Sequence, residues 1–263
     1  MSVHQLNQRA QFSAAAAGYD RFAHTQRAVA NQLFEGLAHA GEMRRILDVG
    51  CGTGALTRHL AIAWPEAEVE GIDHAQGMIE EARRISGNAE RPRYLLADAQ
   101  SFRAPLPYDL IASSSTLHWI QPLEFTLRHL ASLLAPHGTF AFAIMLERTL
   151  CELHSARAQI APNNTPASKM PSHNVVMQGL AGAGLRVVAS EVQEFLVHAE
   201  SASSLLGDLR ALGVTGGPLS LGARPLTRGE VHQLLALYER SFRDERGVRA
   251  TYHVGYYWGQ RND

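Results

Sequence analysis

Short apolar runs alternate with amphipathic stretches between residues 44 and 146 of this 263-residue chain. The apolar runs have the length and residue types of buried strands, which we predict at 45–49, 69–73, 93–97, 109–113 and 139–146. The stretches between them have apolar residues at helical spacing, and we predict helices at 55–64, 75–85 and 122–134. Strands separated by helices are typical of βαβ units with right-handed crossovers. The pattern therefore predicts an α/β fold with a doubly wound parallel sheet.

Outside this core the pattern is less regular. Residues 4–40 are predicted to be largely helical with an interruption near 17–20, and residues 154–174 to be an irregular insertion. Further elements are predicted as a helix at 175–183, a strand at 186–197, a loop at 213–226, a helix at 227–242 and a final strand at 250–258. Thr227 and Glu230 have the spacing of a capping box before the last of these helices.

Composition and charge narrow the class of protein. The chain is 46% hydrophobic and has 24 basic against 25 acidic residues, so its balance gives no sign of a nucleic-acid or membrane-surface binder. The only cysteines are Cys51 and Cys151, which indicates a reducing compartment. The longest strongly apolar run, at 140–146, is far shorter than the ~20 residues of a membrane span. We expect a cytoplasmic protein that binds neither nucleic acid nor membrane.

The strongest local signal is a glycine loop, LDVGCGTG at 47–54, between the first predicted strand and helix. Gly50, Gly52 and Gly54 allow the backbone to turn tightly and approach a ligand, while the following helix offers free N–H groups. A glycine loop alone is also compatible with a tight turn that binds nothing.

Three acidic residues favour a nucleotide ligand at this loop. Asp73 ends the second predicted strand, where an acidic side chain can accept hydrogen bonds from both hydroxyls of a ribose. Asp98 follows the third predicted strand, where it would contact the edge of an adenine ring. Asp48 precedes the loop, where it would repel a pyrophosphate and suit a cationic ammonium group. The set therefore favours S-adenosylmethionine over NAD, and a dehydrogenase is the weakest alternative.

Four motifs in order resemble those of the class I S-adenosylmethionine-dependent methyltransferases. They are the glycine loop at 47–54, GID at 71–73, ADAQ at 97–100 and the segment PYDLIASSSTLHW at 107–119. The resemblance implies a Rossmann-like, seven-stranded, mostly parallel sheet whose last strand, 250–258, is antiparallel. It also implies that the cofactor S-adenosylmethionine is bound by Asp48, Gly50, Cys51, Gly52, Asp73, Met78, Asp98, Ala99 and Ser114.

Segments outside this core resemble the BioC-type malonyl-[acyl-carrier protein] O-methyltransferases of biotin biosynthesis. They lie at 12–20, 117–119, 149–153, 209–213, 226–227 and 251–254. The resemblance implies carboxyl methylation of a malonyl thioester on acyl carrier protein or coenzyme A. Tyr19, His118 and Trp119 are implied as catalytic residues, and Tyr19, Trp119, Lys169 and Tyr252 as substrate contacts. Packing roles remain alternatives for Tyr19 and Trp119, and a solvated side chain for Lys169.

On this basis we expect one methyltransferase domain over residues 1–263 and a monomer. Its parts would be a helical lid at 1–40, a cofactor-binding core at 41–146, a substrate-cap insertion with a helix and a strand at 147–228, and a last helix and strand at 229–263.

The expected chemistry needs no acid–base pair, because a carboxylate is already ionised at neutral pH. In agreement, the sequence has no metal-binding signature and no hydrolase-type serine motif. Two alternatives remain open at this point. One is a small-molecule carboxyl methyltransferase of the trans-aconitate type, and the other is a non-catalytic protein that binds S-adenosylmethionine.

Overall fold

A single mixed sheet organises the chain. The computed structural model describes residues 3–262 except 39, 88, 165, 167–169 and 216–222. Its strands are β1 Arg45–Val49, β2 Glu68–Asp73, β3 Arg93–Leu96, β4 Tyr108–Ser114, β5 Leu134–Met145, β6 Leu185–Ala199, β7 Arg243–Asp244 and β8 Gly247–Arg261. The sheet order is β3-β2-β1-β4-β5-β8-β6, and β8 runs antiparallel to both β5 and β6. The predicted seven-stranded sheet with an antiparallel last strand is confirmed, and the two-residue β7 adds a short eighth strand beside β8.

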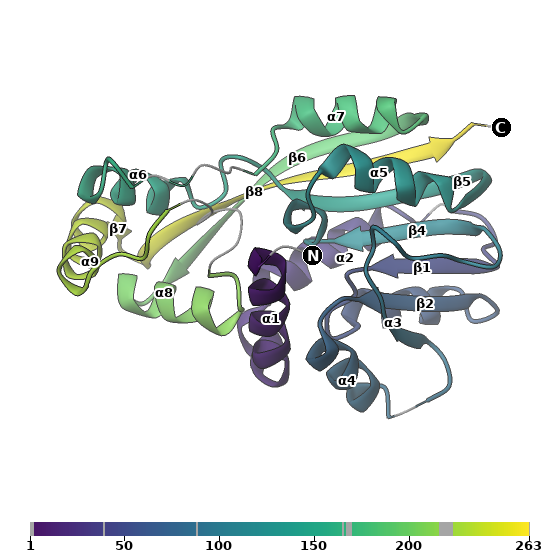
Figure 1. Cartoon of the computed structure of the whole chain (residues 1–263), viewed down its shortest axis with the longest axis horizontal. Coiled ribbons are helices and arrows are strands. Elements are labelled where there is room, and N and C mark those ends of the chain that lie inside the picture. Colours follow the sequence, from purple (N-terminus) through teal and green to yellow (C-terminus); the bar gives the residue numbers. More distant parts are fainter. Residues whose placement is uncertain are drawn as a thin grey trace.

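Helices cover both faces of the sheet, as the doubly wound pattern predicts (Figure 1). Alternate side chains of a strand point to opposite faces, so Ile46 and Leu47 enter two different cores. Helices α2 (His24–Glu35) and α3 (Ala55–Ala63) pack on the Ile46 face. Helices α5 (Leu123–Ser132) and α7 (His173–Gly182) pack on the Leu47 face. The parallel strands are therefore buried on both sides, which explains their continuous apolar runs.

Two long strands carry a second group of helices. Strands β6 and β8 have 15 residues each and extend beyond the parallel strands (Figure 1). Helices α6 (Cys151–Ile160), α8 (Ala202–Ala211) and α9 (Arg228–Phe242) pack around this extension, and we call these three helices with β7 the cap. Leu205 and Tyr238 of the cap share one apolar core with Ala250 of β8 and with α2. The capping box of Thr227 and Glu230 at the start of α9 is confirmed.

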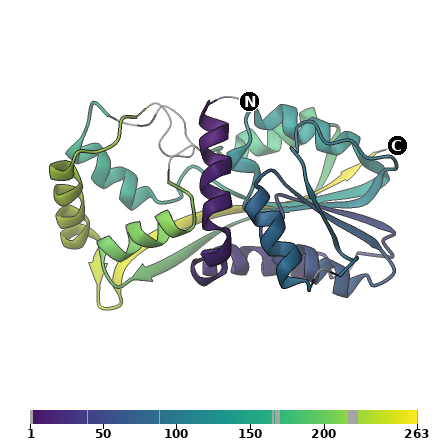
Figure 2. The ribbon, with the colours of Figure 1, turned by 60° about the horizontal axis from the view of Figure 1, so that its bottom comes forward.

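The N-terminal helix lies between the cap and the parallel strands (Figure 2). This helix, α1 (Val3–Phe22), packs on α4 (Gln76–Ile85), where the Gly77 N–H donates to the Ser13 hydroxyl at 3.2 Å. A Cβ on Gly77 would lie 2.3 Å from the Ser13 carbonyl oxygen, so only glycine permits this close approach. The helix therefore covers the carboxyl-terminal edge of the sheet.

Three local predictions are wrong. Helix α1 continues through residues 17–20, because its alanine run favours helix, and the chain breaks at Ala23 instead. Residues 154–160 belong to helix α6, whose packing in the cap outweighs the small polar residues that indicated a loop. Strand β5 begins at Leu134, where we predicted a helix that ends at 134 and a strand that begins only at 139.

A second helix of the cap, besides α6, was not predicted. It is α8, which begins with a capping box formed by Ser201 and Ser204. Among the described residues no helix is long and apolar enough to span a membrane.

Candidate active site

A cavity of about 380 Å³ lies at the carboxyl ends of β1, β2, β3 and β4, under α1 and α2. This is the edge at which open α/β sheets bind their ligands. Eleven of the residues predicted for the site line it, namely Tyr19, Asp48, Gly50, Cys51, Gly52, Asp73, Met78, Asp98, Ala99, Ser114 and Trp119. The fold thus brings the four sequence motifs together at one place.

The glycine loop has the left-handed backbone that its sequence predicts. Gly50 has φ +68°, and a Cβ there would lie 2.1 Å from Cγ2 of Thr116, so the loop needs glycine for packing. Gly52 has φ +54°, and a Cβ there would meet no atom within 4 Å. Gly50 therefore serves the close contact with the segment after β4, whereas Gly52 leaves room for a ligand.

Asp48 is a buried acid at the inner end of the cavity. Asp48 is only 1% exposed, and its carboxylate accepts a hydrogen bond of 2.6 Å from the Thr57 hydroxyl. Burial raises the pKa of Asp48 to about 7, against the opposing effect of the Thr57 hydrogen bond, and the nearby Asp73 raises it further. A cationic group bound beside Asp48 would stabilise its ionised form, so the site suits an ammonium ligand.

Asp73 and Asp98 are each oriented by backbone N–H groups. The Gly52 N–H donates to Oδ2 of Asp73 at 3.1 Å, and the Ala75 N–H donates to Oδ1 at 2.8 Å. Asp73 therefore also holds the glycine loop in shape, a role that the sequence did not reveal. Burial raises the pKa of Asp73. The Gln100 N–H donates to Oδ1 of Asp98 at 2.9 Å, which fixes this carboxylate at the cavity wall.

Four buried polar atoms in the cavity wall have no hydrogen-bond partner among the described residues. They are Nε2 of Gln8, Oε1 of Gln26 and the Oγ atoms of Ser114 and Ser115. Buried polar groups in folded proteins are nearly always paired, so these atoms indicate a polar ligand in the cavity. Of these four residues only Ser114 was predicted for the site. Gln8 carries no local sequence signal, because its position depends on how α1 packs.

The last turn of α1 is attached to the glycine loop. The Thr53 hydroxyl donates to Oδ1 of Asp20 at 2.8 Å. Next to Asp20, burial and then the charge of Asp73 raise the pKa of the Tyr19 phenol, so this group keeps its proton at neutral pH. Earlier in the same helix, the Phe12 ring meets the Trp119 ring edge-on, with centroids 5.2 Å apart. Helix α1 thus contacts the cavity wall at two places, near its middle at Trp119 and in its last turn at the glycine loop.

Two of the other predicted residues, His118 and Tyr252, do not line the cavity within the described part of the chain. His118, on the short 3-10 helix η1 (Leu117–Trp119), is 3% exposed and packs against Trp119 with ring centroids 5.3 Å apart. Burial lowers the pKa of His118 to about 3, so its ring is neutral. Tyr252 is buried on β8, where burial and then Asp208 raise its pKa to about 12. Lys169 lies outside the described residues.

The described residues contain no group of three or more histidine, cysteine, aspartate or glutamate side chains placed to hold a metal ion. The sequence predicts no metal ligand either.

Comparison with known proteins identifies the family. A family model described as a methyltransferase domain matches residues 46–138. The malonyl-[acyl-carrier protein] O-methyltransferase of Anoxybacillus flavithermus is 34% identical over 254 residues, which cover 95% of this chain and 94% of that protein. The enzyme of the same name from Halorhodospira halophila is 32% identical, over 95% of this chain and 86% of its own. The chain belongs to the malonyl-[acyl-carrier protein] O-methyltransferase family.

The resemblance predicted from the motifs is therefore confirmed, and the chain is a methyltransferase. The similarity to the two full-length relatives extends over α1 and the cap, which the domain match at 46–138 leaves out. Among solved structures, the YcgJ protein from Bacillus subtilis superposes with a TM-score of 0.60 at 14% identity, covering 89% of this chain and 98% of that one. At this identity the likeness concerns the fold alone.

Proposed function

We propose that the methyltransferase transfers a methyl group from S-adenosylmethionine to the free carboxylate of a malonyl thioester carried by acyl carrier protein. The observation that carries this proposal is the similarity over 95% of the chain to relatives of that name, which includes the lid and the cap as well as the cofactor core. The reaction would be the early step of biotin synthesis that the resemblance implies, carried out in the cytoplasm by a monomer.

The polar groups that line the cavity suit those of S-adenosylmethionine. Asp48 and the free Oε1 of Gln26 would accept hydrogen bonds from the cofactor's ammonium group. Asp73 would accept hydrogen bonds from the ribose hydroxyls, and Asp98 would accept one from the adenine amino group. The open space at Gly52 would receive the cofactor beside the loop. The remaining contacts would come from Gly50, Cys51, Met78, Ala99 and Ser114, which also line the cavity.

When it is bound, S-adenosylmethionine supplies an electrophilic methyl group: the C–S bond breaks as a carboxylate oxygen forms the new C–O bond, and the electron pair stays on sulfur. No proton moves in this step, so the protein needs no general base. The Tyr19 phenol, whose pKa is raised by burial, can donate a hydrogen bond but does not act as a base at neutral pH. His118, whose pKa of about 3 keeps it neutral, would shape the pocket behind Trp119.

Exclusion of water is the main catalytic contribution that we assign to the lid. The reaction brings an anion and a cation together and removes both charges, so a dry site of low polarity favours the transition state over the separated reactants. The rings of Phe12 and Trp119, whose centroids are 5.2 Å apart, form the apolar part of the wall that the lid contributes to. Tyr19 lies in the same helix as Phe12 and would help to align the acceptor with the methyl group.

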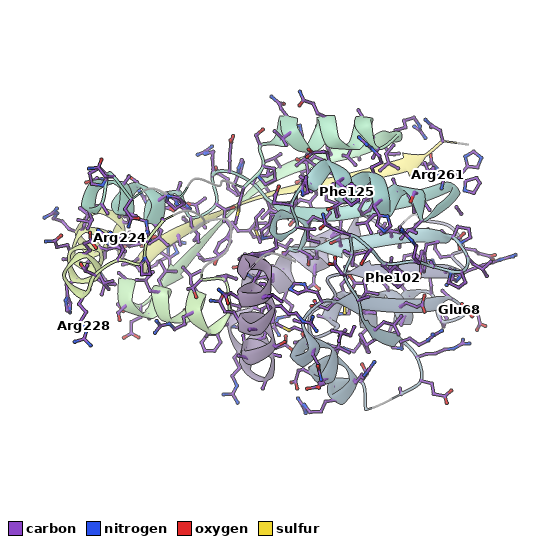
Figure 3. The ribbon with its side chains drawn as sticks, viewed as in Figure 1. Glu68, Phe102, Phe125, Arg224, Arg228 and Arg261 are labelled. Atoms are coloured by element: carbon purple, nitrogen blue, oxygen red, sulfur yellow. The ribbon has the colours of Figure 1, made fainter. Side chains whose placement is uncertain are left out.

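The carrier protein would dock on the cap. Carrier proteins are acidic, so their docking surface should be basic. In and next to the cap, Arg224 and Arg243 are neutralised by ion pairs of 2.6 Å with Glu230 and Glu239, and Arg246 lies beside Asp244, to which its backbone N–H donates at 2.8 Å. Among the described residues no ion pair joins an acidic side chain to Arg228 or Arg240, and we assign the docking to these two side chains. Figure 3 shows Arg224 and Arg228 at the outer end of the cap, at the opposite end of the molecule from Glu68.

An acceptor comparison tests this proposal. Radiolabelled S-adenosylmethionine is supplied with malonyl carrier protein, malonyl-CoA or trans-aconitate at equal concentrations. We expect the highest kcat/KM with malonyl carrier protein, and the double variant Arg228→Ala/Arg240→Ala should lose this preference while keeping its rate with malonyl-CoA. A higher kcat/KM with trans-aconitate would contradict the proposed acceptor, whereas binding of S-adenosylmethionine without any turnover would contradict an enzymatic role.

A further inference from the structure

Two adjacent serines at the end of β4 line the cavity and have unpaired hydroxyl groups. The Oγ atoms of Ser114 and Ser115 are both buried, and both lack a hydrogen-bond partner among the described residues. A serine hydroxyl is one donor and two acceptors, so leaving it unpaired in a buried place costs free energy. A ligand that accepts or donates hydrogen bonds would remove this cost.

The backbone around these serines is fixed on both sides. The Ser115 N–H donates to the carbonyl of Ala143 on β5 at 2.9 Å. The Thr116 hydroxyl lies 3.1 Å from the carbonyl oxygens of both Gly50 and Ser114, to which it donates. Ser115 itself has φ +55°, a left-handed conformation that is unfavourable for a residue with a Cβ. Such conformations persist where surrounding contacts impose them, and they are common at ligand-binding sites.

The two serines have different neighbours in the sheet. The residues assigned to the cofactor lie at the ends of three strands: Asp48 is the next-to-last residue of β1, Asp73 ends β2 and Asp98 follows β3. These strands lie in the order β3-β2-β1 beside β4. Ser114 is the last residue of β4 and neighbours the glycine loop through Thr116. Ser115 is attached to β5, on the side of β4 away from β2 and β3. Ser114 therefore lies next to the residues that we assign to the cofactor, whereas Ser115 is held on the β5 side of β4.

We propose that the Ser115 hydroxyl donates a hydrogen bond to the carboxylate of the acceptor and thereby sets which carboxylate oxygen faces the methyl group. This inference rests on the proposed function, and it adds an acceptor-binding residue to it. The hydroxyl proton stays on Ser115 throughout, because the transfer only exchanges a C–S bond for a C–O bond.

A neutral donor suits this reaction better than a cation. The carboxylate loses its charge during methyl transfer, so a partner that binds charge strongly would stabilise the reactant more than the transition state. The segment after β4 offers only uncharged groups, namely Ser115, Thr116 and the neutral ring of His118. The cations in the cavity wall, Arg9 and Arg27, come from α1 and α2, and Arg27 donates to the carbonyl oxygen of Asp20 at 2.8 Å.

The two serines provide a matched pair for a test. The variants Ser115→Ala and Ser114→Ala each remove one free hydroxyl, and each is assayed for kcat/KM with malonyl carrier protein and for the Kd of S-adenosylhomocysteine. A hydrogen bond to a charged group predicts a decrease of about tenfold to a hundredfold in kcat/KM for Ser115→Ala, with an unchanged Kd. Ser114→Ala should instead raise the Kd of S-adenosylhomocysteine.

A third variant distinguishes binding from packing. Asparagine adopts left-handed conformations more readily than most residues and carries an N–H donor, so Ser115→Asn should recover part of the lost kcat/KM. If Ser115→Ala does not fold, Ser115→Gly removes the hydroxyl at a backbone that glycine prefers. Unchanged kcat/KM in the hydroxyl-free variant, a raised Kd like that of Ser114→Ala, or no recovery in Ser115→Asn would overturn the inference. A wild-type protein that transfers no methyl group to malonyl carrier protein would overturn the proposed function itself.

Discussion

The hydroxyl of Thr53 in the glycine loop donates a hydrogen bond of 2.8 Å to the carboxylate of Asp20 in the last turn of α1. This contact joins the lid to the loop that would carry the cofactor. With the Ser13–Gly77 hydrogen bond it fixes α1 to two elements of the cofactor core, the glycine loop and α4. Lid closure and cofactor binding should therefore depend on each other.

Removal of this contact should weaken cofactor binding. Thr53→Val keeps the side-chain volume but lacks the hydroxyl, so Asp20 loses its donor and α1 is held less firmly. We expect the Kd of S-adenosylhomocysteine to rise about fivefold to tenfold, as for the loss of one hydrogen bond. Isothermal titration calorimetry measures this, and Thr53→Ser, which keeps the hydroxyl, is the control. Equal Kd values for Thr53→Val and wild type would show that this contact of the lid does not contribute to cofactor binding.

The ionised Asp48 carboxylate should destabilise the native state and strengthen the binding of the cofactor. Burial raises its pKa from an ordinary 3.8 to about 7, so the native state holds this proton more strongly than the unfolded chain. Its contribution to the free energy of unfolding therefore falls as the pH rises through that window. Asp48→Asn keeps an oxygen acceptor for Thr57, and at pH 8 we expect a higher Tm for the ligand-free variant. A lower Tm would mean that the ionised carboxylate stabilises the native state.

The same group should make cofactor binding depend on pH. An ammonium ligand favours the ionised form of Asp48, so the Kd of S-adenosylhomocysteine should rise by up to about tenfold for each unit of pH below about 7. The Asp48→Asn variant should bind more weakly at pH 8 and lose most of this pH dependence. Titrations at several pH values check this, and a wild-type Kd that is constant below pH 7 contradicts it.

Two glycines of the loop should respond differently to alanine. At Gly50 the new Cβ would meet the Thr116 side chain at 2.1 Å, so Gly50→Ala should lower the free energy of unfolding by about 1–3 kcal/mol. At Gly52 the Cβ would enter open space that we assign to the cofactor. Gly52→Ala should therefore cost less stability and raise the Kd of S-adenosylhomocysteine. Thermal melts and calorimetry on both variants test this contrast, and a reversed order would contradict the assignment of that space.

Tyr19 should act as a donor and not as a base. Its pKa is raised by burial and by Asp73, so the phenol is protonated over the neutral range. With saturating cofactor, Tyr19→Phe should lower kcat about tenfold without changing the shape of the kcat–pH profile between pH 7 and 9. A wild-type profile that rises with pH and becomes flat in Tyr19→Phe would identify the phenol as a base instead.

Local sequence features predicted which residues meet at the cavity that we assign to the cofactor. The glycine loop, Asp73 and Asp98 each sit where a strand ends, and parallel strands bring their carboxyl ends to one edge of a sheet, so their meeting follows from the alternation of strands and helices. The antiparallel place of β8 was expected from the resemblance and not from periodicity.

Other features of the cavity wall could not be predicted in the same way. Gln8 lines the cavity because α1 packs against α4, and the unpaired hydroxyl of Ser115 depends on a left-handed backbone that serine rarely adopts. These two features arise from contacts between segments far apart in the sequence, which residue types alone do not encode. His118 was expected in the site, but it packs against its neighbour Trp119 and does not line the cavity.

The most direct test of the proposed reaction is the mass and base lability of the carrier protein after incubation with enzyme and S-adenosylmethionine. Malonyl carrier protein should gain one methyl group that mild base releases as methanol, because the product is a methyl ester of the free carboxylate. Acetyl carrier protein, which lacks that carboxylate, should gain none. A methyl group on the acetyl form, or one on the malonyl form that base does not release as methanol, would contradict carboxyl methylation of the malonyl group.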